Sequence, residues 1–324
     1  MTAQTVLDAV RDGLAEEMRR DATVWAVGED LHIGGLYGQY RGLIDEFGPD
    51  RIVATPISEA MIVSAGLGGA LAGTRPVVEM RIADFALSAI DELVNQIAKA
   101  RFMFGGQARV PVVVRLPQGM VTGSAAQHSQ SLESWYVHVP GLVVLAPSTA
   151  ADCKGLLKSA IRCDDPVILI EPRAIWQSTG EVPEGDHCVP IGEARLVREG
   201  GDITLVTWST MASVAHKAME ACVETGTDVE FLDLRSLWPW DTGAVLASVR
   251  KTGRLLVVHE AVQVCGLGAE IVATVVEKIY GDLRRPPRRL GAPRAPVPFS
   301  PPLETAYRVT QQKIEQAIRE MVAP

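Results

Sequence analysis

Residues 142–170 of this chain read LVVLAPSTAADCKGLLKSAIRCDDPVILI, and this stretch decides the fold. Its two apolar, β-branched runs, 142–146 and 167–170, predict buried strands. The segment between them, 150–162, has the pattern of a helix. Strands this apolar suit a parallel sheet that is covered on both faces. The stretch therefore predicts an α/β fold with a doubly wound sheet.

The same alternation extends toward the N-terminus. Further strands are expected at 24–27, 77–80 and 110–115, and further helices at 60–72 and 88–104. Together with residues 142–170, these segments predict a first doubly wound domain.

A second alternating set follows a stretch in which Pro, Gly and charged residues gather. It predicts strands at 203–208, 228–233 and 255–259, and helices at 213–225, 242–249, 269–280 and 311–321. We therefore expect domains over residues 1–180 and 201–324, with a linker over 181–200. The proline-rich segment GAPRAPVPFSPP, residues 291–302, is expected to lack regular structure.

Composition narrows the class of protein. The net charge of −8 argues against nucleic acid or an anionic membrane as the main partner. The five cysteines are far apart and form no C-x-x-C, which fits a reducing cytoplasm better than a disulfide framework or a zinc site. No run approaches the roughly 20 apolar residues that span a bilayer. The N-terminal segment has a helical pattern and no signal-like apolar run, so we expect a cytoplasmic protein.

Common catalytic motifs are absent from the sequence. The glycines of GLGGALAG, residues 66–73, do not match G-x-G-x-x-G, and close packing through small residues explains them more simply. There is no phosphate-binding P-loop, no G-x-S-x-G and no H-E-x-x-H. Hydrolase and kinase functions therefore lose their usual support.

Individual residues leave two interpretations open. In TPISEAM, Ser58 has the position of an N-cap and Glu59 lies in the first helical turn, where an acid favours the helix dipole. His128, in AAQHSQ, is expected in a loop, where an imidazole can exchange protons near pH 7 or serve structure alone. Phe85 is either a core aromatic or a binding platform. His259 ends a strand and is a weaker candidate for ligand binding.

Taken together, several segments resemble one family. They are VWAVGED, GLIDEFGPDRIVATPISEA, FALSAIDELVNQIAKARFMFGGQ, GSAAQHSQSLESWYVHVPGL, PSTAADCKGLLKSAIRCDDPVILIE and PVPFSPPLE, which together span most of the chain. The chain resembles the β subunits of the first, decarboxylating component of 2-oxoacid dehydrogenase complexes, within the transketolase-like superfamily. The resemblance implies a transketolase-like pyrimidine-binding domain followed by a transketolase C-terminal-like domain.

The resemblance also implies roles for individual residues. Glu59 matches the glutamate that hydrogen-bonds the aminopyrimidine ring of thiamine diphosphate, and partial burial would suit proton sharing. Phe85 matches the aromatic that stacks on this ring, and Ile57 is expected at the cofactor too. His128 matches a histidine near the reacting centre, and Glu29 matches an acid of a proton relay.

A structural potassium ion is a further implication of the resemblance. Its ligands would be mostly backbone carbonyl oxygens, which suit a hard cation. The matching positions are Val112, Ala160, Ile161, Cys163 and Asp165. Cys163 stands where many relatives have Asp, a difference that matters little if only its carbonyl binds.

The sequence has no GDG motif, through which thiamine-diphosphate enzymes hold Mg²⁺ and the diphosphate. The resemblance therefore implies an α subunit that supplies this half of the site, in an α₂β₂ tetramer. It further implies a 2-oxoacid substrate, pyruvate or branched-chain, and a lipoyl-bearing acyltransferase core as partner. Three alternatives stay open: an acetoin-cleaving β subunit, half of a split transketolase, and a non-catalytic β-like scaffold. Arg81, where relatives more often have apolar or neutral residues, puts the substrate rather than the fold in doubt.

Overall fold

The computed structural model describes residues 1–323, which form two compact units. Unit 1 comprises Met1–Gln118 and Trp135–Ile191. Unit 2 comprises Gly119–Ser134 and the chain from Gly192 onward. The division near residue 191 lies within the stretch expected as a linker, whose flanks carry short strands. The segment 119–134 joins the second unit although its neighbours in sequence belong to the first.

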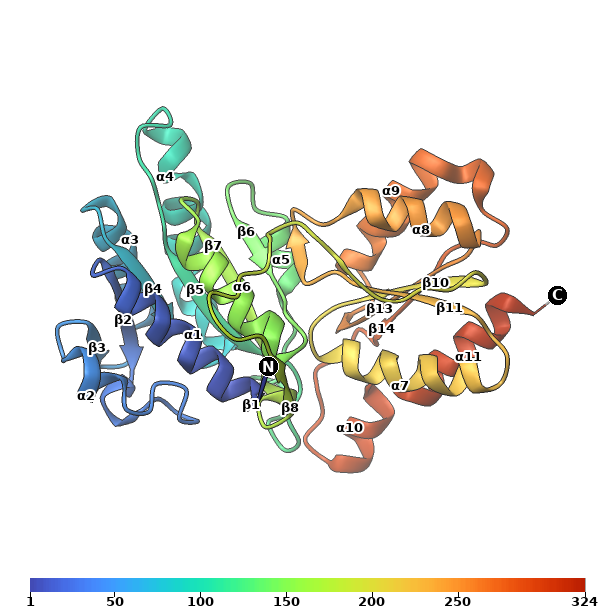
Figure 1. Ribbon diagram of the computed structural model, residues 1–324, viewed down its shortest axis with the longest axis horizontal. Coiled ribbons are helices and arrows are strands. Elements are labelled where there is room, and N and C mark those ends of the chain that lie inside the picture. The colour runs from blue at the N-terminus through green and yellow to red at the C-terminus, as the bar shows by residue number, and fades with distance from the viewer. Residues whose placement is uncertain (324) are drawn as a thin grey trace. The chain divides into compact units, whose positions relative to one another are not determined.

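Unit 1 is built on a parallel sheet (Figure 1). Its strands follow the order β6 (Val143–Leu145), β7 (Val167–Pro172), β5 (Val113–Gln118), β4 (Arg75–Glu79), β2 (Val24–Glu29) and β3 (Ile52–Thr55). Each neighbouring pair is parallel. Because all these strands run the same way, their carboxyl ends share one edge of the sheet, the edge where open α/β sheets bind ligands.

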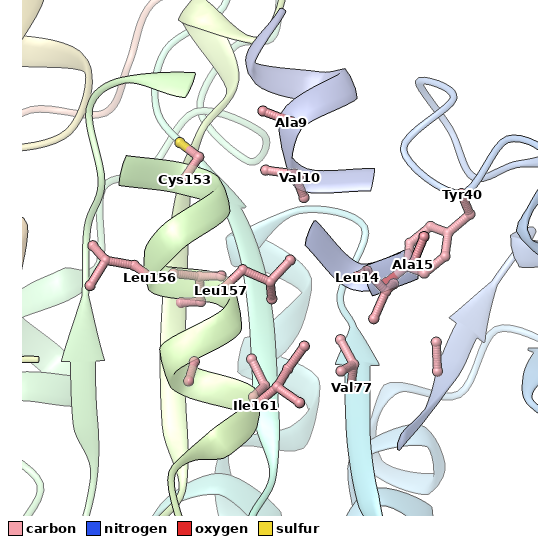
Figure 2. Close-up of a cluster of buried hydrophobic side chains, with 14 of the residues drawn as sticks. Ala9, Val10, Leu14, Ala15, Tyr40, Val77, Cys153, Leu156, Leu157 and Ile161 are labelled. Carbon is pink, nitrogen blue, oxygen red and sulfur yellow. The ribbon is translucent and has the colours of Figure 1, made fainter. Parts of the chain in front are cut away.

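Two long helices cover one face of this sheet. They are α1 (Val6–Arg20) and α6 (Ala150–Arg162), which pack on each other and on alternate strand residues. Figure 2 shows Leu14, Leu157, Ile161 and Val77 of this fully buried core. Each buried leucine contributes roughly 1.5–3 kcal/mol of hydrophobic stabilisation.

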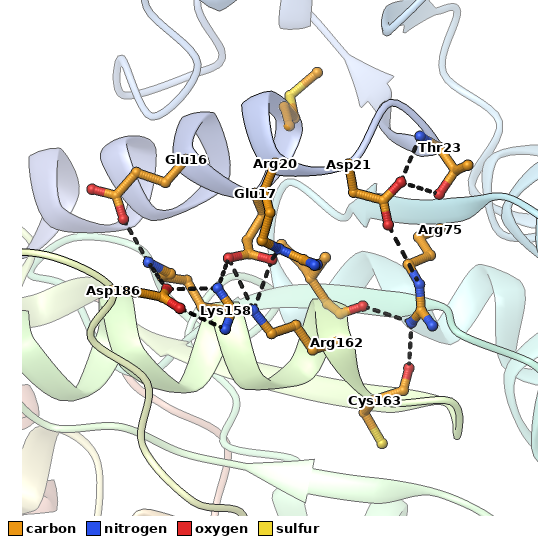
Figure 3. Close-up of polar contacts among 12 residues, drawn as sticks. Glu16, Glu17, Arg20, Asp21, Thr23, Arg75, Lys158, Arg162, Cys163 and Asp186 are labelled. Atoms are coloured by element: carbon orange, nitrogen blue, oxygen red, sulfur yellow. Dashed lines mark hydrogen bonds and ion pairs between the residues drawn. The ribbon is translucent and has the colours of Figure 1, made fainter.

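An ion network also joins α1 to α6 (Figure 3). Arg162 and Arg20 contact the carboxylate of Glu17, which is only 1% exposed, at 2.6 and 2.7 Å. Lys158 reaches Glu16 at 2.6 Å and Asp186 at 2.8 Å. Two guanidinium groups thus offset the cost of burying the Glu17 carboxylate.

The other face of the sheet carries α3 (Glu59–Leu71), which approaches β4 through a glycine. A Cβ at Gly66 would lie 2.5 Å from a methyl of Val78, so the close approach needs this glycine. The remaining helical turns and strands of unit 1 are η1 (Leu31–Ile33), α2 (Leu43–Phe47), η2 (Ala83–Ala89), η3 (Glu92–Ile97), α4 (Ala98–Met103), η4 (Arg173–Ile175), and the antiparallel pair β1 (Thr2–Thr5) and β8 (Thr179–Val182). The short helix α5 (Glu133–Val137) spans the change from unit 2 to unit 1.

Unit 2 has a sheet of its own, in the order β14 (Arg288–Ala292), β13 (Leu255–Val262), β10 (Ile203–Thr207), β11 (Val229–Asp233) and β9 (Arg195–Arg198). Only β9 is antiparallel to its neighbour in this sheet. Helices α7 (Thr210–Glu224) and α11 (Gln311–Val322) cover one face, and α8 (Thr242–Thr252) and α9 (Leu267–Ile279) cover the other (Figure 1). Strand β12 (Ser236–Trp238), η5 (Tyr280–Asp282) and α10 (Pro301–Tyr307) complete the unit.

The expected fold class, two doubly wound α/β domains, is confirmed, and one local expectation was wrong. The proline-rich segment 291–302 contains the end of β14 and the start of α10, whose first residues are Pro301 and Pro302. Proline lacks only a donor that the first helical turn leaves unpaired, so it can open a helix. The segment expected as a helix over 88–104 is helical up to Met103, with 3₁₀, π and α turns in succession.

Candidate active site

Glu59 is the first residue of α3 and follows strand β3 after a three-residue turn. Its side chain is partly exposed, and the neighbouring Ile57 is 75% exposed. Ser58 occupies the N-cap position, as expected, but its side chain makes no capping hydrogen bond. An accessible acid therefore lies beside an exposed apolar side chain at the carboxyl edge of the sheet.

Glu29 lies at the carboxyl end of β2, and Phe85 lies after the carboxyl end of β4. Glu29 is the last residue of β2 and pairs in register with Thr55 of β3. Its buried carboxylate lies 3.5 Å from the guanidinium of Arg81. Phe85 lies in η2, which follows β4 and contacts α3. The parallel strands β3, β2 and β4 thus carry Glu59, Glu29 and Phe85 to one edge of unit 1.

A buried polar cluster lies at the same edge, and sequence reasoning missed it. Arg115 of β5 binds Glu171 of β7 through two nitrogen–oxygen contacts of 2.5 and 3.0 Å, and it lies 3.1 Å from Glu79 of β4. Tyr40 donates to Glu79 at 3.0 Å, and Gln39 donates to it at 3.3 Å. All five side chains are buried. The sequence did contain a signal for this cluster, because Glu79, Arg115 and Glu171 are charged residues within otherwise apolar strands.

Burial dominates the electrostatics of this cluster. It raises the pKa of Glu79 to about 7, partly against the attraction of Arg115, while the nearby carboxylate of Glu171 raises it further. One arginine thus faces two carboxylates in a water-poor environment, so a proton on Glu79 would balance the cluster. Glu79 is a buried group that can exchange a proton near neutral pH.

His128 belongs to the segment Gly119–Ser134 of unit 2 and is partly buried. The segment has no regular structure before α5 begins at Glu133. Ala125, at the start of AAQHSQ, has a positive φ of 56°, which is uncommon for a residue other than glycine. The backbone of this loop therefore adopts a conformation that needs support from the rest of unit 2.

His259 lies in the core of unit 2 and is fully buried. Its Nδ1 is 3.0 Å from the carbonyl oxygen of Ala261, and its ring stacks on Trp208 at 5.5 Å between centroids. Burial lowers the pKa of His259 to about 4, so the ring is neutral at physiological pH. This environment suits a structural histidine better than a ligand-binding one.

Four of the residues expected around a potassium ion, Ala160, Ile161, Cys163 and Asp165, lie at or just after the end of helix α6. Ala160, Ile161 and Cys163 belong to its last turn and C-cap, where carbonyl oxygens point outward and the helix dipole favours cations. The carbonyls of Ile161 and Cys163 accept hydrogen bonds from Arg75 at 2.9 and 3.0 Å (Figure 3). The carboxylate of Asp165 pairs with Arg101.

Carbonyl oxygens are the type of ligand that a hard cation takes, and the Arg75 guanidinium already contacts two of these oxygens. The carbonyl of Val112 accepts from the amide of Val167 at 2.8 Å, and that of Ala160 accepts from the amide of Cys163 at 3.2 Å. A carbonyl oxygen has two lone pairs, so each retains one. Among residues 1–323, no group of three His, Cys, Asp or Glu side chains could hold a metal ion.

Comparison with known proteins identifies two family models in the chain. "Transketolase, pyrimidine binding domain" matches residues 2–177, and "Transketolase, C-terminal domain" matches residues 192–314. A solved structure described as "Split gene transketolase, inactive beta4 tetramer" has a TM-score of 0.82 over 98% of both chains at 20% identity, which supports the fold.

Curated relatives are similar along nearly the whole chain. The pyruvate dehydrogenase E1 component subunit beta-1, mitochondrial, of Arabidopsis thaliana is 42% identical, over 97% of this chain and 87% of its own. The acetoin:2,6-dichlorophenolindophenol oxidoreductase subunit beta of Bacillus subtilis is 40% identical, over 97% and 96%. The 2-oxoisovalerate dehydrogenase subunit beta of Bacillus subtilis is 37% identical, over 99% of both chains.

Proposed function

Because the chain belongs to the transketolase-type family of dehydrogenase β subunits, we propose that it is the β subunit of a thiamine-diphosphate-dependent 2-oxoacid dehydrogenase first component. With an α subunit in an α₂β₂ tetramer, it decarboxylates a 2-oxoacid and passes the acyl group to a lipoyl group of an acyltransferase core. The observation that carries this proposal is the accessible carboxylate of Glu59 at the start of α3, within TPISEA.

Bound thiamine diphosphate supplies the carbon chemistry, and the chain's own residues bind and activate it. Glu59 would accept a hydrogen bond from the aminopyrimidine end, and Ile57 and Phe85 would offer it apolar contacts. Glu29 carries protons at the same edge of the sheet. His128 holds or donates a proton at the reacting centre. The α subunit would bind Mg²⁺ and the diphosphate, because this chain has no GDG motif.

A structural potassium ion is part of the proposal. It would share the carbonyls of Ile161 and Cys163 with Arg75 at the end of α6. The proposed location is the cytoplasm, in line with five free cysteines. Within residues 1–323, no helix has the length and apolarity to cross a bilayer.

Glu59→Gln tests the central residue of this proposal in the purified α/β complex. The amide keeps the size of the side chain but not its basicity, so kcat for 2-oxoacid decarboxylation should fall by at least about 100-fold. The melting temperature and the assembly with α should not change. Asp45→Asn is the control, because Asp45 is also an acid in the first turn of a helix of unit 1. Near-normal turnover of assembled Glu59→Gln would contradict the assignment.

Acetoin cleavage is the second candidate, since the acetoin relative is about as similar to the chain as the pyruvate relative. A panel of pyruvate, branched-chain 2-oxoacids and acetoin with an artificial electron acceptor separates these substrates. Transfer to an aldose phosphate would indicate half of a split transketolase instead. A complex that assembles but binds no thiamine diphosphate would indicate a non-catalytic scaffold.

A further inference from the structure

The loop that carries His128 is fastened to unit 2 by buried or partly buried acids. Its residues, Gly119–Ser134, follow β5 in sequence, include the start of α5 and belong to unit 2. The inference below rests on the proposed function, in which His128 acts at the reacting centre.

Glu260, in β13, holds the loop at two points. Its Oε1 accepts the backbone N–H of Met120 at 3.1 Å, and its Oε2 accepts the hydroxyl of Ser131 at 3.2 Å. Met120 and Ser131 flank His128, so one carboxylate fixes both sides of the histidine. Burial raises the pKa of Glu260, and the N–H of Met120 opposes this shift.

Gly119 makes the approach of the loop to Glu260 possible. Its φ of +100° is a conformation that L side chains rarely adopt, and a Cβ there would lie 2.5 Å from Oε2 of Glu260. The start of the loop is therefore shaped to fit around this carboxylate.

Glu304, in α10, provides a third point. It is 2% exposed, and its Oε1 accepts the backbone N–H of Gly123 at 2.9 Å. The far end of the loop is fixed as well, because Trp208 donates to Glu133 at 3.2 Å and Ser134 accepts the first N–H of α9 at 3.1 Å. The carboxylate of Glu304 is buried and that of Glu260 is partly buried, so both lose hydration that their hydrogen bonds to the loop replace.

We propose that Glu260 and Glu304 are positioning residues, which hold the loop 119–134 so that His128 keeps the orientation needed for turnover. Neither acid is a catalytic residue in this scheme. They act through three hydrogen bonds to the main chain and to Ser131, on either side of AAQHSQ.

The test compares Ala and Gln variants of both acids in the α/β complex. Glu260→Ala and Glu304→Ala remove the acceptor, so amide hydrogen exchange of peptides within 119–134 should become about tenfold faster. The kcat should fall by between about tenfold and 100-fold, with a smaller change in KM, because small displacements of a reacting group are costly. The Gln variants retain an acceptor oxygen and should recover most of the activity.

Glu230→Gln and Glu230→Ala are the matched controls. Glu230 is also a buried acid of unit 2, and it accepts the N–H of Gly200 at 3.2 Å, away from the loop. These variants should change neither loop exchange nor kcat. If an Ala variant fails to fold, Gly119→Ala displaces the loop while both acids remain, and it should reproduce the loss of kcat.

Unchanged exchange in 119–134 after both Ala substitutions would overturn the proposal, and so would faster exchange with unchanged kcat. A wild-type complex that is inactive with every 2-oxoacid and with acetoin would refute the proposed function instead. In that case the exchange experiment would still decide whether these acids hold the loop.

Discussion

Glu79 is the residue whose ionisation should make stability depend on pH. It lies at the carboxyl end of β4 with Arg115 and Glu171, and burial raises its pKa from 4.5 to about 7. Between these two values the folded protein holds a proton that the unfolded chain has lost. Stability from this group is therefore complete below pH 4.5 and declines as the pH rises toward 7.

Glu79→Gln should remove this pH dependence, because the amide resembles the protonated acid. The shift from 4.5 to about 7 corresponds to up to about 3 kcal/mol. From pH 5 to pH 8, the free energy of unfolding of wild type should therefore fall relative to that of Glu79→Gln. Urea unfolding at several pH values measures the difference, and a constant difference would show that Glu79 does not titrate in this range.

Single residues also show how far the sequence could predict the site. TPISEA and AAQHSQ predicted Glu59 at a helix start and His128 in a loop, and the structure agrees with both local settings. Glu260 and Glu304 could not be found in this way. They contact the loop from 140 and 181 residues away, and no local pattern encodes such a partner.

At the scale of elements, strands with a strong apolar pattern were predictable and short polar ones were not. The runs in β7 and β10 are buried along their whole length, so hydrophobicity alone reveals them. Strands β1 and β8 have the sequences TAQT and TGEV, which show no strong apolar pattern. Each is a strand because it pairs with the other. Such strands depend on tertiary contacts, which periodicity does not report.

The end of helix α6 should respond to potassium. If K⁺ binds the carbonyls of Ala160, Ile161 and Cys163, the melting temperature should be a few degrees higher in potassium chloride than in sodium or choline chloride at equal ionic strength. Cys163→Ala should keep this difference, since its carbonyl remains. Differential scanning calorimetry measures it, and equal melting temperatures in all three salts would show that no potassium ion binds beside Arg75, which donates to the carbonyls of Ile161 and Cys163.

At the scale of the whole molecule, the chain carries only part of what its proposed cofactor needs. The acid and apolar groups proposed to bind the aminopyrimidine lie at one edge of unit 1, whereas the sequence has no GDG for Mg²⁺ and the diphosphate. Without Mg²⁺ and the residues that bind it, the negatively charged diphosphate would have few favourable contacts. Thiamine diphosphate would then bind to this chain only weakly. Cofactor affinity should therefore be a property of the complex rather than of this chain.

Isothermal titration calorimetry can test this dependence directly. The chain alone, titrated with thiamine diphosphate and Mg²⁺, should give no measurable heat, and the α/β complex should bind one cofactor per αβ pair. Glu59→Gln in the complex should weaken binding by about tenfold or less, since most of the affinity comes from the diphosphate end. This modest loss contrasts with the loss of at least about 100-fold expected in kcat. Tight binding by the chain alone would show that unit 1 or unit 2 has its own diphosphate site, and the proposed division between α and β would then be wrong.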